Sequence, residues 1–333
     1  MKLGFSLSPG GLLFPYHLGV LSSLEHRGYI TDQTPLAGSS AGAIAVASHA
    51  ARVDPMEALN GCIRISEQCM ASGGSGGARG RLMNLLEKEL DDMLPHDAHT
   101  IVNNRDGLIG FAWKEIFPLP TKNVLATKFN NREDFIEAVV NSSMFPFFTS
   151  NLPFVVRRSS TISKQKKDKE EDKNIEFANM ETLDNKDYDT DSTSPTEEVA
   201  RPKKLILPVL TLPRLVVDGF FTVPRQRFGC PIFPPHSGVD REVTVSVFPH
   251  DTIGLTASEP HNQISPILEE GEDSATLLQM LFQAAVNPST AREHERIFER
   301  GYRDAIRWAD EEDRRRAEVN DFFMSNLQVS PFV

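Results

Sequence analysis

The chain has 333 residues, of which 40% are hydrophobic and 24% are charged, and its formal net charge is −11. This length is sufficient for one large α/β domain or for two smaller domains. The acidic balance, without a basic stripe that carries aromatic residues, argues against a nucleic acid partner. The three cysteines have no metal-ligand spacing, which predicts a reducing compartment, no disulfide and no metal site.

The start of the chain has no pattern of a secretory signal, because Met1 and Lys2 lead into an alternating segment rather than a sustained apolar run. The apolar stretch from Met144 to Val156 is interrupted by Pro146 and Pro153 and is too short to cross a bilayer. We therefore expect a cytoplasmic protein without a transmembrane helix, whose contact with lipid is peripheral.

The first segment predicts a strand, a glycine turn and a helix. Residues 2–8 alternate as in a strand, and apolar residues recur at helical spacing from Leu12 to His26. Between them, Gly10 and Gly11 can present unshielded N–H groups as an oxyanion hole, form a phosphate cradle, or make a plain tight turn. The full glycine spacing of a dinucleotide site is missing, which disfavours the cradle.

A second strand-to-helix turn follows at Gly38-Ser39-Ser40-Ala41-Gly42. A short apolar run precedes it, and small apolar residues continue after it at helical spacing. This is the pattern of a nucleophile elbow, in which a serine stands on a sharp turn. The two glycines are expected where the strand and the helix pass too closely for a Cβ. The N-terminus of the helix favours negative charge that develops at the serine.

The middle of the chain continues to alternate between helices and strands. Apolar periodicity, capping residues and proline positions predict helices over 54–69, 81–94 and 131–141, and strands over 106–113 and 122–129. A glycine-rich linker at 72–80 separates the first two helices. The aromatic cluster at Phe145, Phe147 and Phe148 is typical of core packing, and equally of the wall of a pocket for acyl chains.

Residues 157–204 mix both signs of charge and have almost no apolar periodicity, which predicts a disordered insert. Beyond the insert, an apolar strand ends at Asp218-Gly219 and residues 241–248 alternate as a strand. Helices are expected over 274–286 and 291–317. Strands that alternate with helices predict a parallel sheet with crossover helices, which places both glycine turns at the carboxyl edge of the sheet.

A serine nucleophile needs a base to accept its proton. Asp218 can fill this role alone, because its strand delivers the carboxylate to the edge of the sheet. Alternatively, Ser40, Asp218 and His250 follow the serine, acid and histidine order of the α/β-hydrolases. The residues alone leave both arrangements open.

Several of these motifs, taken together and in order, carry a family resemblance. They are the turn within residues 6–20, the elbow around Ser40, the segments 94–99 and 129–146, and Asp218-Gly219. Over roughly residues 2–225, the chain resembles a patatin-like phospholipase domain, in particular the adipose triglyceride lipase branch. It departs from the family pattern at Pro9 and Phe220, where the family has small residues.

The resemblance implies an α/β protein with a three-layer α/β/α patatin-like fold and a mostly parallel central sheet. Residues 1–250 then form the catalytic domain, with the disordered insert at 157–204 inside it. Residues 251–333 form a helical extension that packs on this domain. The serine of the elbow and the strand-end aspartate then meet in one site.

The resemblance also implies a lipase or phospholipase that cleaves glycerolipid acyl esters through an acyl-enzyme, without a cofactor. Its substrate, phospholipid or triacylglycerol, would lie at a membrane or lipid-droplet surface, and a protein activator is conceivable. The two alternatives are a weak or inactive module that binds lipid surfaces or partners, and a triad esterase that uses His250. The implied site residues are the nucleophile Ser40, the base and acid Asp218, the oxyanion donors Gly10 and Gly11, the elbow glycines Gly38 and Gly42, and the pocket residues Phe145, Phe147, Phe148 and Phe220.

Overall fold

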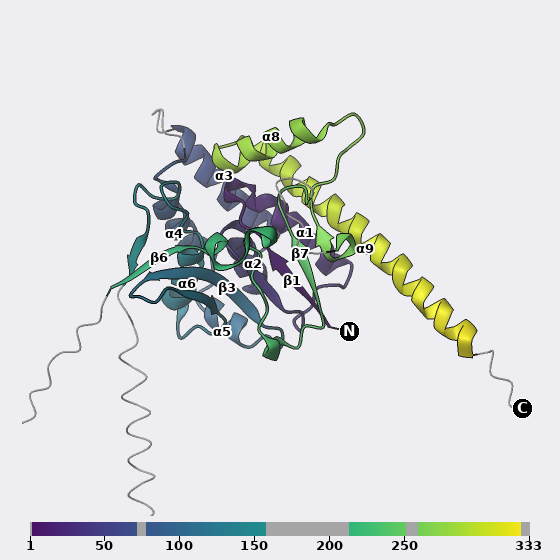
Figure 1. Cartoon of the computed structure of the whole chain (residues 1–333). Helices are drawn as coiled ribbons and strands as arrows, with labels where there is room; N and C mark the ends of the chain where they lie inside the picture. The colour runs from purple at the N-terminus through teal and green to yellow at the C-terminus, as the bar shows by residue number, and fades with distance from the viewer. Residues whose placement is uncertain (1, 72–77, 158–212, 251–258, 328–333) are drawn as a thin grey trace, which may run out of the picture. The chain divides into compact units, whose positions relative to one another are not determined.

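In the computed structural model, helices flank a mixed sheet whose strands are mostly parallel (Figure 1). The structure describes residues 2–71, 78–157, 213–250 and 259–327. Two compact units divide the chain: Met1–Val155 together with Leu215–Val333, and Val156–Arg214. The insert expected at 157–204 therefore lies outside the described residues, apart from Arg157.

The sheet of the first unit has the strand order β6-β3-β2-β1-β7-β8, and β4 also pairs with β3. Its parallel pairs are β1 with β2 and β7, β2 with β3, and β7 with β8. Strand β3 pairs antiparallel with β4 and β6, so the predicted parallel sheet is mixed at β3. The strands are β1 (Leu3–Leu7), β2 (Leu36–Gly38), β3 (Ile109–Phe117), β4 (Lys122–Ala126), β5 (Val155–Arg157), β6 (Arg214–Asp218), β7 (Arg241–Val245) and β8 (Gln263–Ile264).

The register of the central strands brings their carboxyl ends together. Leu7, the last residue of β1, lies opposite Gly38 of β2 and Val245 of β7. All five residues of β1 are buried, as expected for a strand that is covered on both faces. The turns that follow β1 and β2 therefore meet at one edge of the sheet, where open α/β sheets place their ligands.

The helices of the described chain include every helix expected from periodicity, within a few residues. Two differences concern α5, which was not expected, and α9, which continues ten residues beyond 317. The helices are α1 (Phe14–His26), α2 (Ala41–Ala50), α3 (Pro55–Ala71), α4 (Leu82–Met93), α5 (Ala98–Asn103), α6 (Arg132–Ser142), α8 (Ser274–Val286) and α9 (Ala291–Leu327). None of them is long and apolar enough to cross a membrane, among the residues described.

Helix α9 packs closely along α1, as Figure 1 shows. Two glycines permit the approach, because a Cβ on Gly19 would overlap the carbonyl oxygen of Phe298, and one on Gly301 would overlap that of Tyr16. Farther along α9, the rings of Trp308 and Phe5 of β1 make an edge-to-face contact, with the ring centres 5.8 Å apart. The last helix thus completes the core around the central strand.

Candidate active site

The turn after β1 presents backbone donors. Gly11 has a φ of +56°, a conformation that favours glycine, and a Cβ there would overlap the carbonyl oxygen of Ala285 on α8. A Cβ on Gly10 would come within 2.9 Å of the Val247 side chain. Among the described residues, neither glycine N–H donates a hydrogen bond. Two backbone donors at the edge of the sheet are therefore available to an external acceptor.

The turn after β2 holds Ser40 in a strained conformation. Ser40 has φ 53° and ψ −120° and immediately precedes α2. A Cβ on Gly38 would overlap the backbone of Gly42, and a Cβ on Gly42 would lie 2.6 Å from the carbonyl oxygen of Leu7. Both glycines are thus required by the close passage of strand and helix. A strained serine that the surrounding chain enforces indicates a functional position.

Asp218 ends strand β6 next to the serine pair. Its side chain is fully buried, Oδ1 accepts a 2.8 Å hydrogen bond from the N–H of Phe220, and its own N–H donates to Met144 O at 2.7 Å. The next residue, Gly219, has no room for a Cβ, which would lie 2.7 Å from the Cβ of Ser39. The Asp-Gly pair is therefore a close-approach site beside the elbow rather than a plain turn.

Burial raises the pKa of the Asp218 carboxyl to about 7, and hydrogen bonds from the Phe220 N–H and the Ser40 side chain limit the rise. Desolvation disfavours the charged carboxylate, whereas donors stabilise it. Oδ2 has no close hydrogen-bond partner among the described residues, so the interaction with the Ser40 hydroxyl is long or poorly aligned. Catalytic hydrogen bonds are often long without substrate. A carboxyl of this pKa can accept a proton and return it near neutral pH.

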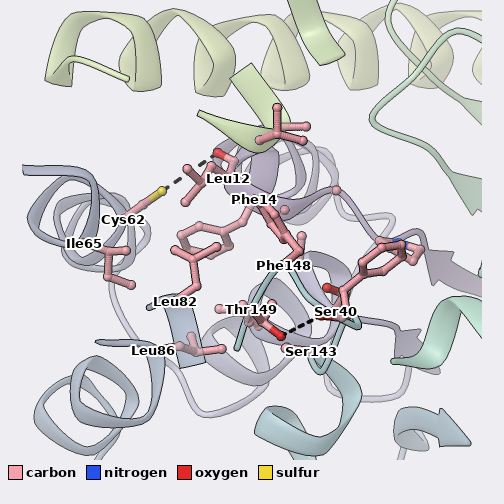
Figure 2. A pocket seen from close by; sticks show the side chains of 18 of the residues that line it. Leu12, Phe14, Ser40, Cys62, Ile65, Leu82, Leu86, Ser143, Phe148 and Thr149 are labelled. Atoms are coloured by element: carbon pink, nitrogen blue, oxygen red, sulfur yellow. Dashed lines mark hydrogen bonds between the residues drawn. The ribbon is translucent and has the colours of Figure 1, made fainter. Parts of the chain in front are cut away.

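A pocket of about 400 Å³ opens onto this edge of the sheet, and Figure 2 shows part of its wall. Ser40, Gly10 and Gly11 all line it, while most of its other lining residues are apolar. The volume falls within the range of small-molecule sites. The lining combines the elbow with apolar side chains from α3, α4 and α8, namely Ala58, Ile65, Leu82, Leu86, Leu90, Met93, Phe282, Ala285 and Val286.

Three of the four phenylalanines expected to form the pocket are placed in its wall: Phe145, Phe148 and Phe220. Phe147 is not among the lining residues. Its backbone has a left-handed φ of +59°, and its side chain is 52% exposed to solvent. The ring of Phe145 stacks on that of Phe221, with centres 5.6 Å apart, which extends the aromatic wall toward the surface.

Two histidines differ in their relation to the site. His250 interacts with the hydroxyl of Ser265, with Nδ1 3.4 Å from Oγ, and it is not among the pocket-lining residues. His17 is buried beneath the first turn, with Nε2 2.8 Å from the carbonyl oxygen of Ser8. Burial lowers the pKa of His17 to about 4, so the imidazole is neutral at physiological pH.

Sequence patterns did not point to several lining residues. Cys62, Glu89, Ser143 and Thr149 reach the pocket from α3, α4 and the segment after α6. The amphipathic pattern of these helices predicts an inward face, but not that part of this face borders a cavity. Among the described residues, no group of three or more His, Cys, Asp or Glu side chains is arranged to hold a metal ion.

The fold and the site define an α/β protein with a serine on a strand-to-helix turn beside a buried carboxyl group. Comparison adds that the family model for patatin-like phospholipase matches residues 5–166, just under half of the chain. At the level of this family, the match supports a lipid acyl hydrolase. No curated protein matches the chain. Among solved structures, VipD from Legionella pneumophila is similar at 11% identity, covering 93% of this chain and 67% of that chain, with a TM-score of 0.38.

Proposed function

We propose that this protein hydrolyses acyl esters of glycerolipids, with Ser40 as nucleophile and Asp218 as base. One observation carries the proposal: the strained Ser40 lines an apolar pocket beside a buried carboxyl whose pKa lies near 7. The family match supports the same reaction class. A serine is activated when a neighbouring base accepts its proton, and no third group is required for that step.

The geometry supports a two-step acyl transfer. The Asp218 carboxylate accepts the hydroxyl proton of Ser40 as Oγ attacks the ester carbonyl carbon. The N–H groups of Gly10 and Gly11 donate to the oxyanion that forms. Collapse of the intermediate breaks the bond to the alcohol, which takes the proton from Asp218 and leaves an acyl-Ser40. Water then attacks this ester by the same route and releases the fatty acid.

The pocket lining supports a long apolar acyl group as the part of the substrate that the protein holds. We propose phospholipid or triacylglycerol as the substrate and a membrane or lipid-droplet surface as its place, with the branch of adipose triglyceride lipase as the finer family assignment. Phosphatidylcholine vesicles and trioleoylglycerol emulsions, assayed side by side, separate the two substrates. A requirement for a protein activator would appear as low activity of the isolated chain on both.

We expect Ser40→Ala to lose ester hydrolysis by at least about 10³-fold, because removal of a nucleophile leaves only binding and oxyanion stabilisation. The matched control is Ser39→Ala, whose buried Oγ has no hydrogen-bond partner among the described residues. Hydrolysis of p-nitrophenyl esters and labelling by a fluorophosphonate are measured for both.

Ser39→Ala should label like wild type, and Ser40→Ala should not label. A wild-type protein that neither labels nor turns over any ester would instead be a catalytically inactive lipid-binding module. A His250→Ala variant as inactive as Ser40→Ala would replace the two-residue arrangement by the triad. Retained activity in His250→Ala supports Asp218 as the sole base.

A further inference from the structure

Exposed apolar side chains gather where the pocket meets the surface. Phe145 lines the pocket and is also exposed, and its ring stacks on that of Phe221, which is exposed as well. Two further apolar side chains follow along the chain. The N–H of Phe147 donates to Leu152 O at 3.3 Å, and both side chains are more than half exposed. Apolar side chains that gather on a surface mark a site of association.

Helix α8 adds apolar surface at the same place. Phe282 lines the pocket although it is 57% exposed. The turn after β1 joins the two groups, because a Cβ on Gly11 would lie 2.3 Å from Ala285 O of α8 and 3.7 Å from the ring of Phe148. We call the exposed apolar residues of both groups the rim: Phe145, Phe147, Leu152, Phe221 and Phe282.

The segments that carry the rim have no charged residue. Residues 142–156, 219–224 and 274–290 contain no Asp, Glu, Lys or Arg, in a chain that is 24% charged and has a net charge of −11. Beside the rim, the exposed Arg79 donates from Nε to Phe147 O at 2.9 Å. Uncharged segments next to a guanidinium fit a phospholipid layer, because its acyl region takes apolar side chains and its phosphates accept hydrogen bonds from arginine.

We propose that the rim docks on a zwitterionic phospholipid layer, so that an acyl chain passes from the layer into the pocket without crossing water. The inference deepens the proposed glycerolipid hydrolysis and rests on it. Each methylene exposed to water makes the exposed state about fourfold less populated, so a long chain needs an apolar path. Phe145 supplies this path, because it belongs to the pocket and to the rim. The negative net charge opposes an anionic layer.

The experiment measures flotation of the Ser40→Ala protein with phosphatidylcholine vesicles, so that binding is followed without turnover. Adding Phe147→Asp should weaken binding at least about tenfold, because it removes an aromatic contact and places a charge in the acyl region. Aspartate tolerates the left-handed backbone at this position, which favours folding of the variant. Leu152→Asp repeats the test at a second rim residue that does not line the pocket.

The matched control is Val319→Asp, which adds the same charge at an apolar residue that is 50% exposed. Val319 lies two turns beyond Glu312 on α9. Glu312 binds Arg241, the first residue of β7, at the edge of the sheet remote from the pocket. Val319→Asp should therefore bind vesicles like its parent.

A tryptophan placed in the rim tests the contact directly. Phe147→Trp should keep vesicle binding, and its emission should shift to shorter wavelength when vesicles are added. Val319→Trp should show no shift. The two native tryptophans, Trp113 and Trp308, are buried and give a constant background.

Two substrates separate the rim from the catalytic residues. With Ser40 restored, Phe147→Asp should hydrolyse soluble p-nitrophenyl butanoate like wild type. It should hydrolyse phosphatidylcholine vesicles at least about tenfold more slowly at low lipid concentration, since fewer molecules are bound. An equal loss on both substrates would overturn the docking role of the rim.

Unchanged vesicle binding in both aspartate variants would overturn the proposal, and so would stronger binding when phosphatidylglycerol replaces part of the phosphatidylcholine. A wild-type dimer that Phe147→Asp converts to a monomer in sedimentation velocity would assign the rim to a second copy of the chain and overturn it too. Vesicle binding through the rim, without turnover of any ester by wild type, would support the docking surface and overturn the proposed hydrolase instead.

Discussion

At the scale of single residues, the site depends on two groups that the fold holds in energetically unfavourable states. Ser40 keeps a backbone conformation that side chains rarely adopt, and Asp218 keeps a carboxyl group fully out of water. Each arrangement is unfavourable for folding and useful for acyl transfer, because the base is dry and the nucleophile is presented at the pocket wall. Substitutions at either residue should therefore affect both folding stability and activity.

The pH dependence of activity should report Asp218. Its pKa is raised to about 7, and only the ionised carboxylate accepts the serine proton. We expect kcat/KM to rise with pH, to reach half its maximum near 7, and to level off above. A pH profile with a soluble ester measures this midpoint. His250→Ala should leave the midpoint in place, and a midpoint near 4 would contradict a buried base.

Asp218→Asn should lose activity yet stabilise the fold at alkaline pH. A carboxyl whose folded pKa is raised binds its proton more tightly in the folded state, so stability falls as pH rises from about 4 to about 7. Asparagine removes this penalty. Thermal unfolding at pH 8 should show a higher Tm for the variant, and the gain should shrink as pH approaches 4. A gain that is constant with pH would contradict the raised pKa.

The tight turn at the elbow was easier to predict from the sequence than the walls of the pocket. Gly38 and Gly42 predicted a close passage of the strand and the helix. The structure confirms it, because a Cβ at either position would overlap neighbouring atoms. The residues that form the pocket wall were harder to predict. Phe147 belongs to the expected aromatic cluster but has a left-handed backbone and is not a lining residue, while Glu89 reads as a solvent-facing helix residue until α3 packs against it.

At the scale of elements, the close contact of α1 with α9 organises the packing behind the sheet. Tyr16 is fully buried there, and its hydroxyl donates to Asp304 at 3.1 Å. Burial raises the pKa of this aspartate to about 6. The two helices approach so closely because glycine stands in each at the crossing, at Gly19 and Gly301.

Gly19→Ala should destabilise the protein by about 2–3 kcal/mol, because its Cβ would overlap a backbone oxygen that cannot move without shifting α9. The matched control is Gly61→Ala, also within a helix, where the nearest atom is a side-chain oxygen of Glu89, 3.1 Å away, rather than a backbone atom. Denaturant unfolding measures both variants. Equal effects would show that loss of helix glycine, rather than the crossing, governs stability.

Helix periodicity predicted most elements because α1, α3, α4 and α8 carry continuous apolar faces or clear caps. It missed α5, a stretch of only 6 residues, which is too short to give an apolar period. It also ended α9 too early, at 317 rather than at Leu327. The antiparallel pairing of β3 with β6 was not foreseeable, because it joins segments that are far apart in the sequence.

At the scale of the whole molecule, ion pairs join segments that are far apart in the sequence. Glu312 of α9 is buried and binds Arg241 of β7 at 2.9 Å, and Arg315 and Arg316 bind the same carboxylate. Burial opposes the charge of Glu312, but the arginines outweigh it and its pKa is lowered. The pair fixes the last helix to the parallel part of the sheet.

Glu312→Gln should destabilise the fold by about 3 kcal/mol, because Arg241 would remain buried without a counter-charge. The native pair stabilises the protein above the unfolded pKa of a glutamate, and this contribution is lost as pH falls through the lowered folded pKa. Urea unfolding at pH 7 and pH 3 measures both effects. The difference between the variant and wild type should be smaller at the lower pH, and a difference that grows there would contradict the ionic origin.

The packing of α9 on α1 also has a consequence for biosynthesis. About 265 residues separate the end of α1 from the start of α9. At translation rates of about 5–20 residues per second, the apolar face of α1 stays uncovered for roughly half a minute before its partner helix is synthesised. For most of this interval, the nucleophile turn has been synthesised while the strand that carries Asp218 has not. A nascent chain therefore exposes hydrophobic surface early and gains activity late, which makes its yield sensitive to holdase chaperones.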